Sequence, residues 1–392
     1  MKVRHVLVLA LVGLVAVPGF LHAQTNFNGG LGLVYVQSAW NLERGVFTLS
    51  NNTRIFGKSA NFPGESPLMI WNISGRISLN YGLGKHFEVS ATPIIYQDTN
   101  QSGEKVNSPD DIFLTLKMGS FTSPTSSFTY GFSVSTRIPT GDKRNVPFEP
   151  YSSNRIGWGM TGLLSYSMDP LYPEHAPNFH INLGYWNHND VGTEVVEGGD
   201  ISTRPQSMTQ ELLYGVGVKV PKDVFDFSLG LYGNAFLQSP PRAAYSRENY
   251  LYVSPAVHYK PLKWMTFNVG VDVRVSKATD KTFYATDGTG AKRTLPGGQP
   301  NYPAWRINFG TSFSLQPSSS YRARERELLM QKAESRRDLF EQIIAEQRET
   351  ESAEAELERI RAERVRAERE LERLRAILEG EAQRARDENE DY

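Results

Sequence analysis

The chain has 392 residues, a formal net charge of −1 and no cysteine. This length allows one large barrel or two ordinary domains, and the balanced charge gives no indication of a nucleic-acid partner. The lack of cysteine excludes disulfides, zinc–thiolate sites, a cysteine nucleophile and a lipid-modified N-terminal cysteine.

The N-terminal residues have the features of a secretory signal. Lys2 and Arg4 precede an apolar run over Val6–Val17, and the chain turns polar after Ala23. A membrane anchor is the alternative, but it needs about 20 apolar residues and this run is shorter. We therefore expect residues 1–23 to be a cleaved signal peptide and the protein to be exported.

From Phe47 to Leu315 the sequence repeats one pattern, a strand with alternating side chains followed by a turn. The clearest case is Trp264–Ser276, in which apolar residues alternate without a break with polar ones, including Asp272 and Arg274. Successive side chains of a strand point to opposite faces, so one face is apolar and the other polar. A soluble sandwich buries the apolar face, whereas an outer-membrane barrel turns it toward lipid.

The connectors between these strands discriminate between the two folds. Short turns such as Gly82–Lys85 and Pro221–Asp223 alternate with long polar loops such as Thr140–Asn154 and Asn187–Met208. Outer-membrane barrels have short periplasmic turns and long external loops, whereas a sandwich has no reason to sort its loops by length. The pattern predicts an all-β transmembrane barrel of about 12 antiparallel strands over residues 46–316. Residues 24–45 are apolar enough for a further strand, and a plug or a periplasmic lead-in is equally compatible with them.

Three segments carry a family resemblance: Gly32–Ser50, Asp110–Gly119 and Arg137–Asp142. They resemble outer-membrane barrels of the phenol meta-pathway transporter-like group and the barrel halves of outer-membrane protein A-type proteins. The resemblance implies a barrel without enzyme activity that is suited to small solutes, and it transfers no catalytic residue. The last strand, Trp305–Leu315, resembles the C-terminal aromatic signal by which the barrel-assembly machinery recognises its clients.

The composition changes abruptly after Pro317. Residues 317–321 read as a linker, and residues 322–392 are rich in Glu, Arg, Ala and Leu, which predicts a long charged helix. A coiled coil is favoured over a single solvated helix. We expect the helix to lie in the periplasm and to associate with a periplasmic partner or with a second copy of itself. The a and d positions of the heptad are Leu357, Ile360, Arg364, Ala367, Leu371, Leu374 and Leu378.

The sequence gives no support for an enzyme or a metal site. His180 and His188 share a face but lie about 26 Å apart at roughly 3.3 Å per residue, and His258 reads as a lone polar wall residue. Glu194, Glu197 and Asp200 crowd one loop, yet a charged external loop is usually only solvated. We expect no catalytic residue, no cofactor and no metal.

In each strand the polar residues that alternate with the apolar, lipid-facing ones should face the lumen. The charged residues on this polar parity include more bases than acids. One hypothesis is a small-solute channel with a weak preference for anions. The alternative is a structural scaffold with a closed, salt-bridged lumen, which tethers the envelope through its helical tail. In either case the expected surroundings are outer-membrane lipid and lipopolysaccharide. The assigned residues are Arg54, Arg76, Glu88, Lys117, Arg137, Arg155, Glu211, Lys219, Asp226, Asp272, Arg274 and Arg306.

Overall fold

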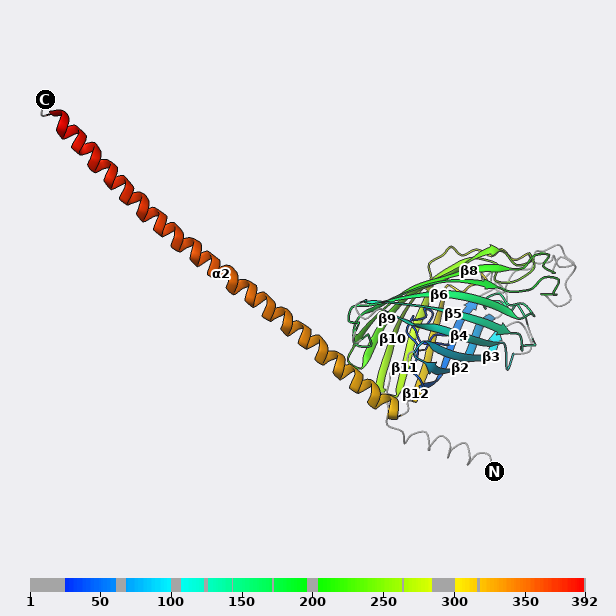
Figure 1. Ribbon diagram of the computed structural model, residues 1–392. Helices are drawn as coiled ribbons and strands as arrows, with labels where there is room; N and C mark the ends of the chain where they lie inside the picture. The colour runs from blue at the N-terminus through cyan, green and yellow to red at the C-terminus, as the bar shows by residue number, and fades with distance from the viewer. Residues whose placement is uncertain are drawn as a thin grey trace. The chain divides into compact units, whose positions relative to one another are not determined.

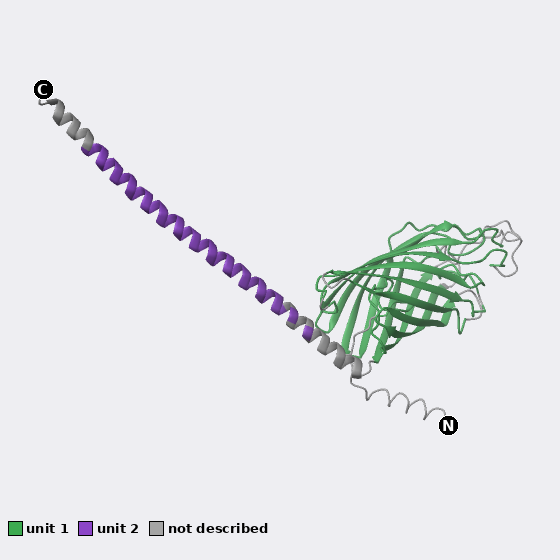
Figure 2. Ribbon diagram, in the orientation of Figure 1, with its two compact units in different colours: residues 1–324 green, residues 325–392 purple. Residues whose placement is uncertain are grey.

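The computed structural model describes residues 25–60, 68–99, 107–122, 126–142, 144–170, 173–195, 204–262, 264–283, 300–315 and 318–390. The expected signal peptide and two acids of the crowded loop, Glu197 and Asp200, lie outside the described residues. The chain forms two compact units, residues 1–324 and 325–392 (Figure 2).

Twelve antiparallel strands form a closed barrel in unit 1 (Figure 1). Each strand pairs with its neighbours in sequence, and the first pairs with the last through Phe47–Leu315 to Ile55–Ile307. The predicted barrel is therefore confirmed. The strands are β1 (Phe47–Ala60), β2 (Leu68–Gly84), β3 (Phe87–Thr99), β4 (Ile112–Phe121), β5 (Phe128–Ile138), β6 (Gly157–Ser167), β7 (Asn178–Asn187), β8 (Gln210–Lys222), β9 (Phe225–Gln238), β10 (Tyr250–Leu262), β11 (Met265–Arg274) and β12 (Trp305–Leu315).

The polarity of the barrel is the reverse of that of a soluble protein. In β11, Phe267, Val269 and Val271 are exposed, whereas the alternate residues Asn268 and Asp272 are buried. The same alternation recurs around the barrel, so its outer face is apolar and its interior is polar. An outward apolar band with a polar interior is the pattern of a membrane-spanning barrel. Among the described helical residues, none form a segment long and apolar enough to cross a membrane.

The interior of the barrel holds the N-terminal segment, residues 25–46, which we name the plug. Its Gly30 amide donates to Asn80 on β2 at 2.7 Å, and its Gln37 amide donates to Asn182 on β7 at 2.6 Å. The Tyr35 hydroxyl donates to Asp272 on β11 at 2.8 Å. Because these strands lie on different sides of the closed sheet, a segment that reaches all three must occupy the lumen. It adds no strand to the barrel.

Glycines in the wall make room for the plug. A Cβ on Gly217 of β8 would lie 2.3 Å from Leu33 Cδ1, well inside contact distance. Leu33 and Val36 of the plug are nearly fully buried against this part of the wall. A barrel of twelve strands is wider than the eight-stranded barrels that side chains alone can fill, so its lumen accommodates a short folded segment.

The described part of unit 2 belongs to a single helix, whose first residues are counted in unit 1. The helix α2 (Ser318–Glu390) has 73 residues, and it begins inside the segment expected to be a linker. Its described side chains are all exposed, including Leu357, Ile360 and Leu371. Ion pairs one turn apart, such as Arg364–Glu368 at 3.0 Å, add a few tenths of a kcal/mol each.

Candidate functional site

A chamber lies inside the barrel between the plug and the connector from β5 to β6. Within this connector, Phe148 is buried against Phe56 and Ile70, which holds residues 144–156 over the lumen. The cavity left between them measures about 210 Å³, enough for about seven waters at 30 Å³ each. Polar and aromatic side chains from the wall, the plug and the connector line it, including Asn28, Gln37, Ser133, Thr161, Asn182 and Tyr214.

Three guanidinium groups of the chamber alternate with two phenyl rings, and we name them the arginine row. Arg54 and Arg76 face the ring of Phe27 at 5.1 and 4.3 Å. Arg76 and Arg137 both lie 5.3 Å from the ring of Phe113. Phe27 belongs to the plug and Phe113 to β4, so the row joins the plug to the wall. Each cation–π contact contributes about 0.5–2 kcal/mol.

The outer members of the row have carboxylate partners, and the middle member does not. Arg54 forms an ion pair with Glu149 of the connector, and Arg137 forms one with Asp111, just before β4. The guanidinium of Arg76 donates to the neutral side chain of Asn28, and its Nε has no hydrogen-bond partner. Among the described residues, no carboxylate lies within ion-pair distance of Arg76, although its side chain is only 5% exposed.

The opposite wall of the chamber is built around Asp272. This carboxylate accepts from Tyr35 at 2.8 Å and from Tyr232 at 3.0 Å, and it faces Arg306 Nε at 3.5 Å. The rings of Tyr35 and Tyr232 stack with centroids 3.9 Å apart. The other oxygen of Asp272 accepts from Ser254 Oγ at 2.8 Å and Asn308 Nδ2 at 2.7 Å, so both carboxylate oxygens have donors. The Tyr35 hydroxyl also lies 2.9 Å from Asn308 Oδ1.

A second buried carboxylate, Glu88, anchors the plug. It accepts from the amides of Leu31 and Leu42, each at 2.9 Å, and pairs with Lys117 at 3.3 Å. Lys117 also donates to the carbonyl of Leu31 at 3.3 Å. One ion pair of the wall thus holds two points of the plug.

Of the remaining charges assigned to the lumen, apart from Arg155, the two acids have basic partners and the two bases have no carboxylate partner among the residues that the structure describes. Glu211 pairs with His188 at 3.1 Å, and Asp226 pairs with Lys260 of β10 at 2.6 Å. Arg274 donates to the carbonyl of Tyr302, and Lys219 is partly buried on β8. Within the described chain, neither Arg274 nor Lys219 has a carboxylate at ion-pair distance.

Arg155 differs from the expectation. It was assigned to the lumen face of a strand, but β6 begins two residues later, at Gly157. Its side chain is exposed in the preceding connector, where Nε donates to Thr193 at 3.0 Å. Alternation does not extend beyond a strand's end, and therefore the parity argument fails for this residue.

The histidines do not form a common site. His180 Nδ1 lies 2.8 Å from Ser165 Oγ, and His258 Nε2 lies 2.9 Å from Ser228 Oγ. Over the described residues, no group of three or more His, Asp or Glu side chains is arranged to hold a metal ion.

Sequence reasoning missed the acids that come from connectors. Burial raises the pKa of Asp110, which lines the chamber beside Arg137, to about 6. Burial alone would also raise the pKa of Glu149, but Arg54 and Arg76 hold it below its ordinary value. The adjacent acids Asp110 and Asp111 directly before a strand were a usable signal, since they lie at the lumen rim. Nothing in the sequence marks Glu149, whose position depends on the packing of Phe148.

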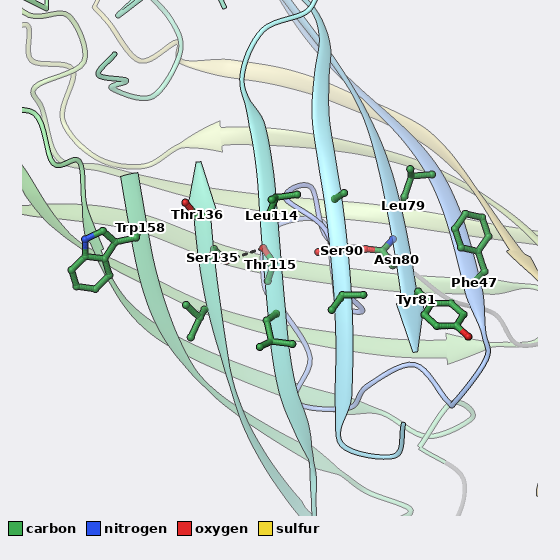
Figure 3. Close-up of a pocket in the computed structure, with 14 residues that line it drawn as sticks. Phe47, Leu79, Asn80, Tyr81, Ser90, Leu114, Thr115, Ser135, Thr136 and Trp158 are labelled. Atoms are coloured by element: carbon green, nitrogen blue, oxygen red, sulfur yellow. Dashed lines mark hydrogen bonds between the residues drawn. The ribbon is translucent and has the colours of Figure 1, made fainter. Parts of the chain in front are cut away.

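A second hollow, of about 610 Å³, lies on the outer face of β1 to β6 (Figure 3). Its outward side chains, among them Leu79, Leu114 and Trp158, are apolar and exposed. Behind this surface, the hydroxyls of Thr115 and Ser135 form a hydrogen bond of 2.8 Å across β4 and β5 (Figure 3). We assign this apolar face to lipid contact and leave the polar chamber as the candidate solute site.

Comparison with known proteins finds structural likeness only. No model of a known protein family matches the chain, and no curated protein matches it. The chain is similar to the NanC porin, with 13% identity and a TM-score of 0.44 over 69% of this chain and 100% of that one. It is similar to an outer membrane channel from Pseudomonas putida F1, with 11% identity and a TM-score of 0.47 over 72% and 100% of the two chains. A Pseudomonas aeruginosa FadL homologue gives 11% identity and a TM-score of 0.34 over 76% and 98%. At these values the likeness assigns no family and no solute, and the chain's own geometry has to carry the functional argument.

Proposed function

We propose that the protein is an outer-membrane channel for small solutes, closed at rest by the plug and opened when the plug leaves its seat. The inverted polarity of the barrel and the export signal support the location. The short connectors, such as residues 85–86 and 223–224, lie on the same side as the start of β1 and the end of β12. We place this side, and with it the tail, in the periplasm.

The observation that carries the proposal is how the plug is held. Its contacts with the wall include hydrogen bonds to separate polar groups, such as Glu88, Asn182 and Asp272. Each such bond contributes about 0.5–1.5 kcal/mol net, because water replaces it when the plug leaves. Release of the plug exposes these polar groups to water, together with the smaller apolar contact that Leu33 and Val36 make with β8. If the signal peptide is removed after Ala23, only the connection at Val46 tethers the plug.

A reversible lock tests this mechanism. The hydroxyls of Thr25 in the plug and Ser312 on β12 lie 3.3 Å apart, and the chain has no cysteine of its own. The Thr25→Cys/Ser312→Cys variant can therefore form one defined disulfide. In planar bilayers we expect few openings of the oxidised protein, and more openings after reduction. The two single-cysteine variants are the controls and should not respond to reductant. Equal conductance of the oxidised and reduced forms would contradict the mechanism.

The second candidate is a structural scaffold with a closed lumen and a tail that holds another component of the envelope. The number of lumen charges in ion pairs favours it, since Glu88, Asp226 and Asp272 each have a basic partner. A scaffold predicts no conductance from the reduced double-cysteine variant. For the tail we propose a parallel coiled coil with a second copy, which crosslinking of purified protein would detect as a dimer that truncation of α2 abolishes.

A further inference from the structure

We propose that the chamber binds a small organic anion, a carboxylate on a flat body about one ring in size, with Arg76 as its anchor. The proposal deepens the proposed channel function and rests on it for the route by which a solute reaches the chamber.

The arginine row has three guanidinium groups, and only two of them form an ion pair with a carboxylate in the part of the chain that the structure describes. Arg54 and Arg137 each pair with a carboxylate, whereas Arg76 between them contacts two phenyl rings and donates its hydrogen bond to a neutral amide. A buried guanidinium without a counter-ion is costly, and the partners that offset this cost best are oxygen pairs that accept two of its hydrogen bonds. The Nε of Arg76 is buried without an acceptor, which leaves a hydrogen-bond donor for a ligand.

The acids nearby do not fill this vacancy. Glu149 pairs with Arg54 through Oε2 while its Oε1 has no hydrogen-bond partner, Glu211 lies 3.1 Å from His188, and Asp272 is held by Arg306 and two tyrosines. Asp110 lines the chamber and accepts from Asn107 at 3.3 Å. An incoming carboxylate would therefore meet Arg76 without displacing an ion pair.

The shape and lining of the chamber select the rest of the ligand. Phe113 and Trp186 form one buried cluster with Ile94. Tyr232 of β9 and Tyr250 of β10 contribute two further rings to the lining. Aromatic walls offer apolar contact and edge-to-face packing for a flat body. The volume of about 210 Å³ is enough for one ring with a carboxylate. Inorganic phosphate would meet Arg76 but gain nothing from the rings.

Isothermal titration calorimetry of the full-length protein in detergent tests the site with three probes: benzoate, its neutral isostere benzamide, and inorganic phosphate. We expect benzoate to bind at least tenfold more tightly than either of the others. Arg76→Gln should weaken benzoate binding at least tenfold, and Arg76→Lys should retain part of it because the charge remains. Arg274→Gln is the matched control, since Arg274 does not line the chamber, and its affinity should equal that of the wild type.

Each outcome decides for or against the site. Equal affinities for benzoate and benzamide, no heat of benzoate binding, or wild-type affinity in folded Arg76→Gln would overturn it. Heat-modifiable mobility on gels checks that each variant is folded, and Arg76→Lys serves if Arg76→Gln does not fold. Conductance of the double-cysteine variant separates the two proposals. Redox-dependent conductance without benzoate binding would overturn only the proposed anion site. Benzoate binding without any conductance would overturn only the proposed channel function.

Discussion

Replacement of Glu88 by Gln should release the plug. In the wild type one buried carboxylate accepts two amides of the plug and pairs with Lys117. A glutamine keeps one acceptor oxygen but turns an NH₂ toward one of the two amides, and it leaves Lys117 buried without its counter-ion. Removal of one partner from a buried pair costs about 3–5 kcal/mol. If most of this cost falls on the docked plug, the ratio of undocked to docked protein should rise roughly a hundredfold to several thousandfold.

Two assays measure this shift. In planar bilayers the open probability of Glu88→Gln should rise, and chymotrypsin should cleave after Phe27, a plug residue that is only 3% exposed in the docked state. Asp226→Asn is the matched control, because it also breaks a buried pair of the wall, with Lys260, at a position that has no described contact with the plug. It should lower the stability of the barrel without opening it. A partial return to the closed state in Glu88→Gln/Lys117→Met would assign the effect to the uncompensated lysine. A closed Glu88→Gln protein that resists chymotrypsin and has wild-type stability would refute the reasoning.

Three further predictions follow from single features. Gly217→Val places a branched side chain where Leu33 of the plug now lies, and overpacking of about 1–3 kcal/mol should raise the open probability in bilayers. The folded-state pKa of Asp110, raised by burial from 3.8 to about 6, makes its contribution to stability greatest at low pH and lost as the pH rises from about 4 through 6. Asp110→Asn should remove this loss of roughly 3 kcal/mol in denaturant titrations, and an unchanged pH dependence would contradict the assignment. Truncation after Ser318 should leave a barrel that still inserts and migrates as a heat-modifiable band, whereas failure to insert would make the tail part of the folding unit.

The strands and their lumen parity were accessible from the sequence because both depend on local alternation. Trp264–Ser276 contains the whole of β11, and the polar parity places Asp272 and Arg306 on the side that the structure buries. A β-strand turned toward lipid on one face and toward polar groups on the other leaves this pattern at every second residue.

The plug and the position of Glu149 were not accessible, because they depend on contacts far apart in the chain. Residues 24–45 are compatible with a strand, a lead-in or a plug until the partners Asn80, Asn182 and Asp272 are known. The excess of bases counted on the strands also fails as a measure of the lumen charge. Glu149 and Asp111 enter from connectors and neutralise Arg54 and Arg137. An anion preference therefore does not follow from a general excess of bases, and the proposed anion site depends on Arg76 alone.

The most direct test of the plugged channel is the conductance of a barrel that lacks residues 25–45. Full-length and shortened proteins would be reconstituted in planar bilayers at equal, verified amounts of folded barrel. The plug fills a lumen whose other inward side chains belong to a twelve-stranded wall, and therefore we predict rare openings for the full-length protein and a steady open current for the shortened one. A shortened barrel that is folded and no more conductive than the full-length protein would contradict the claim that the plug closes the channel.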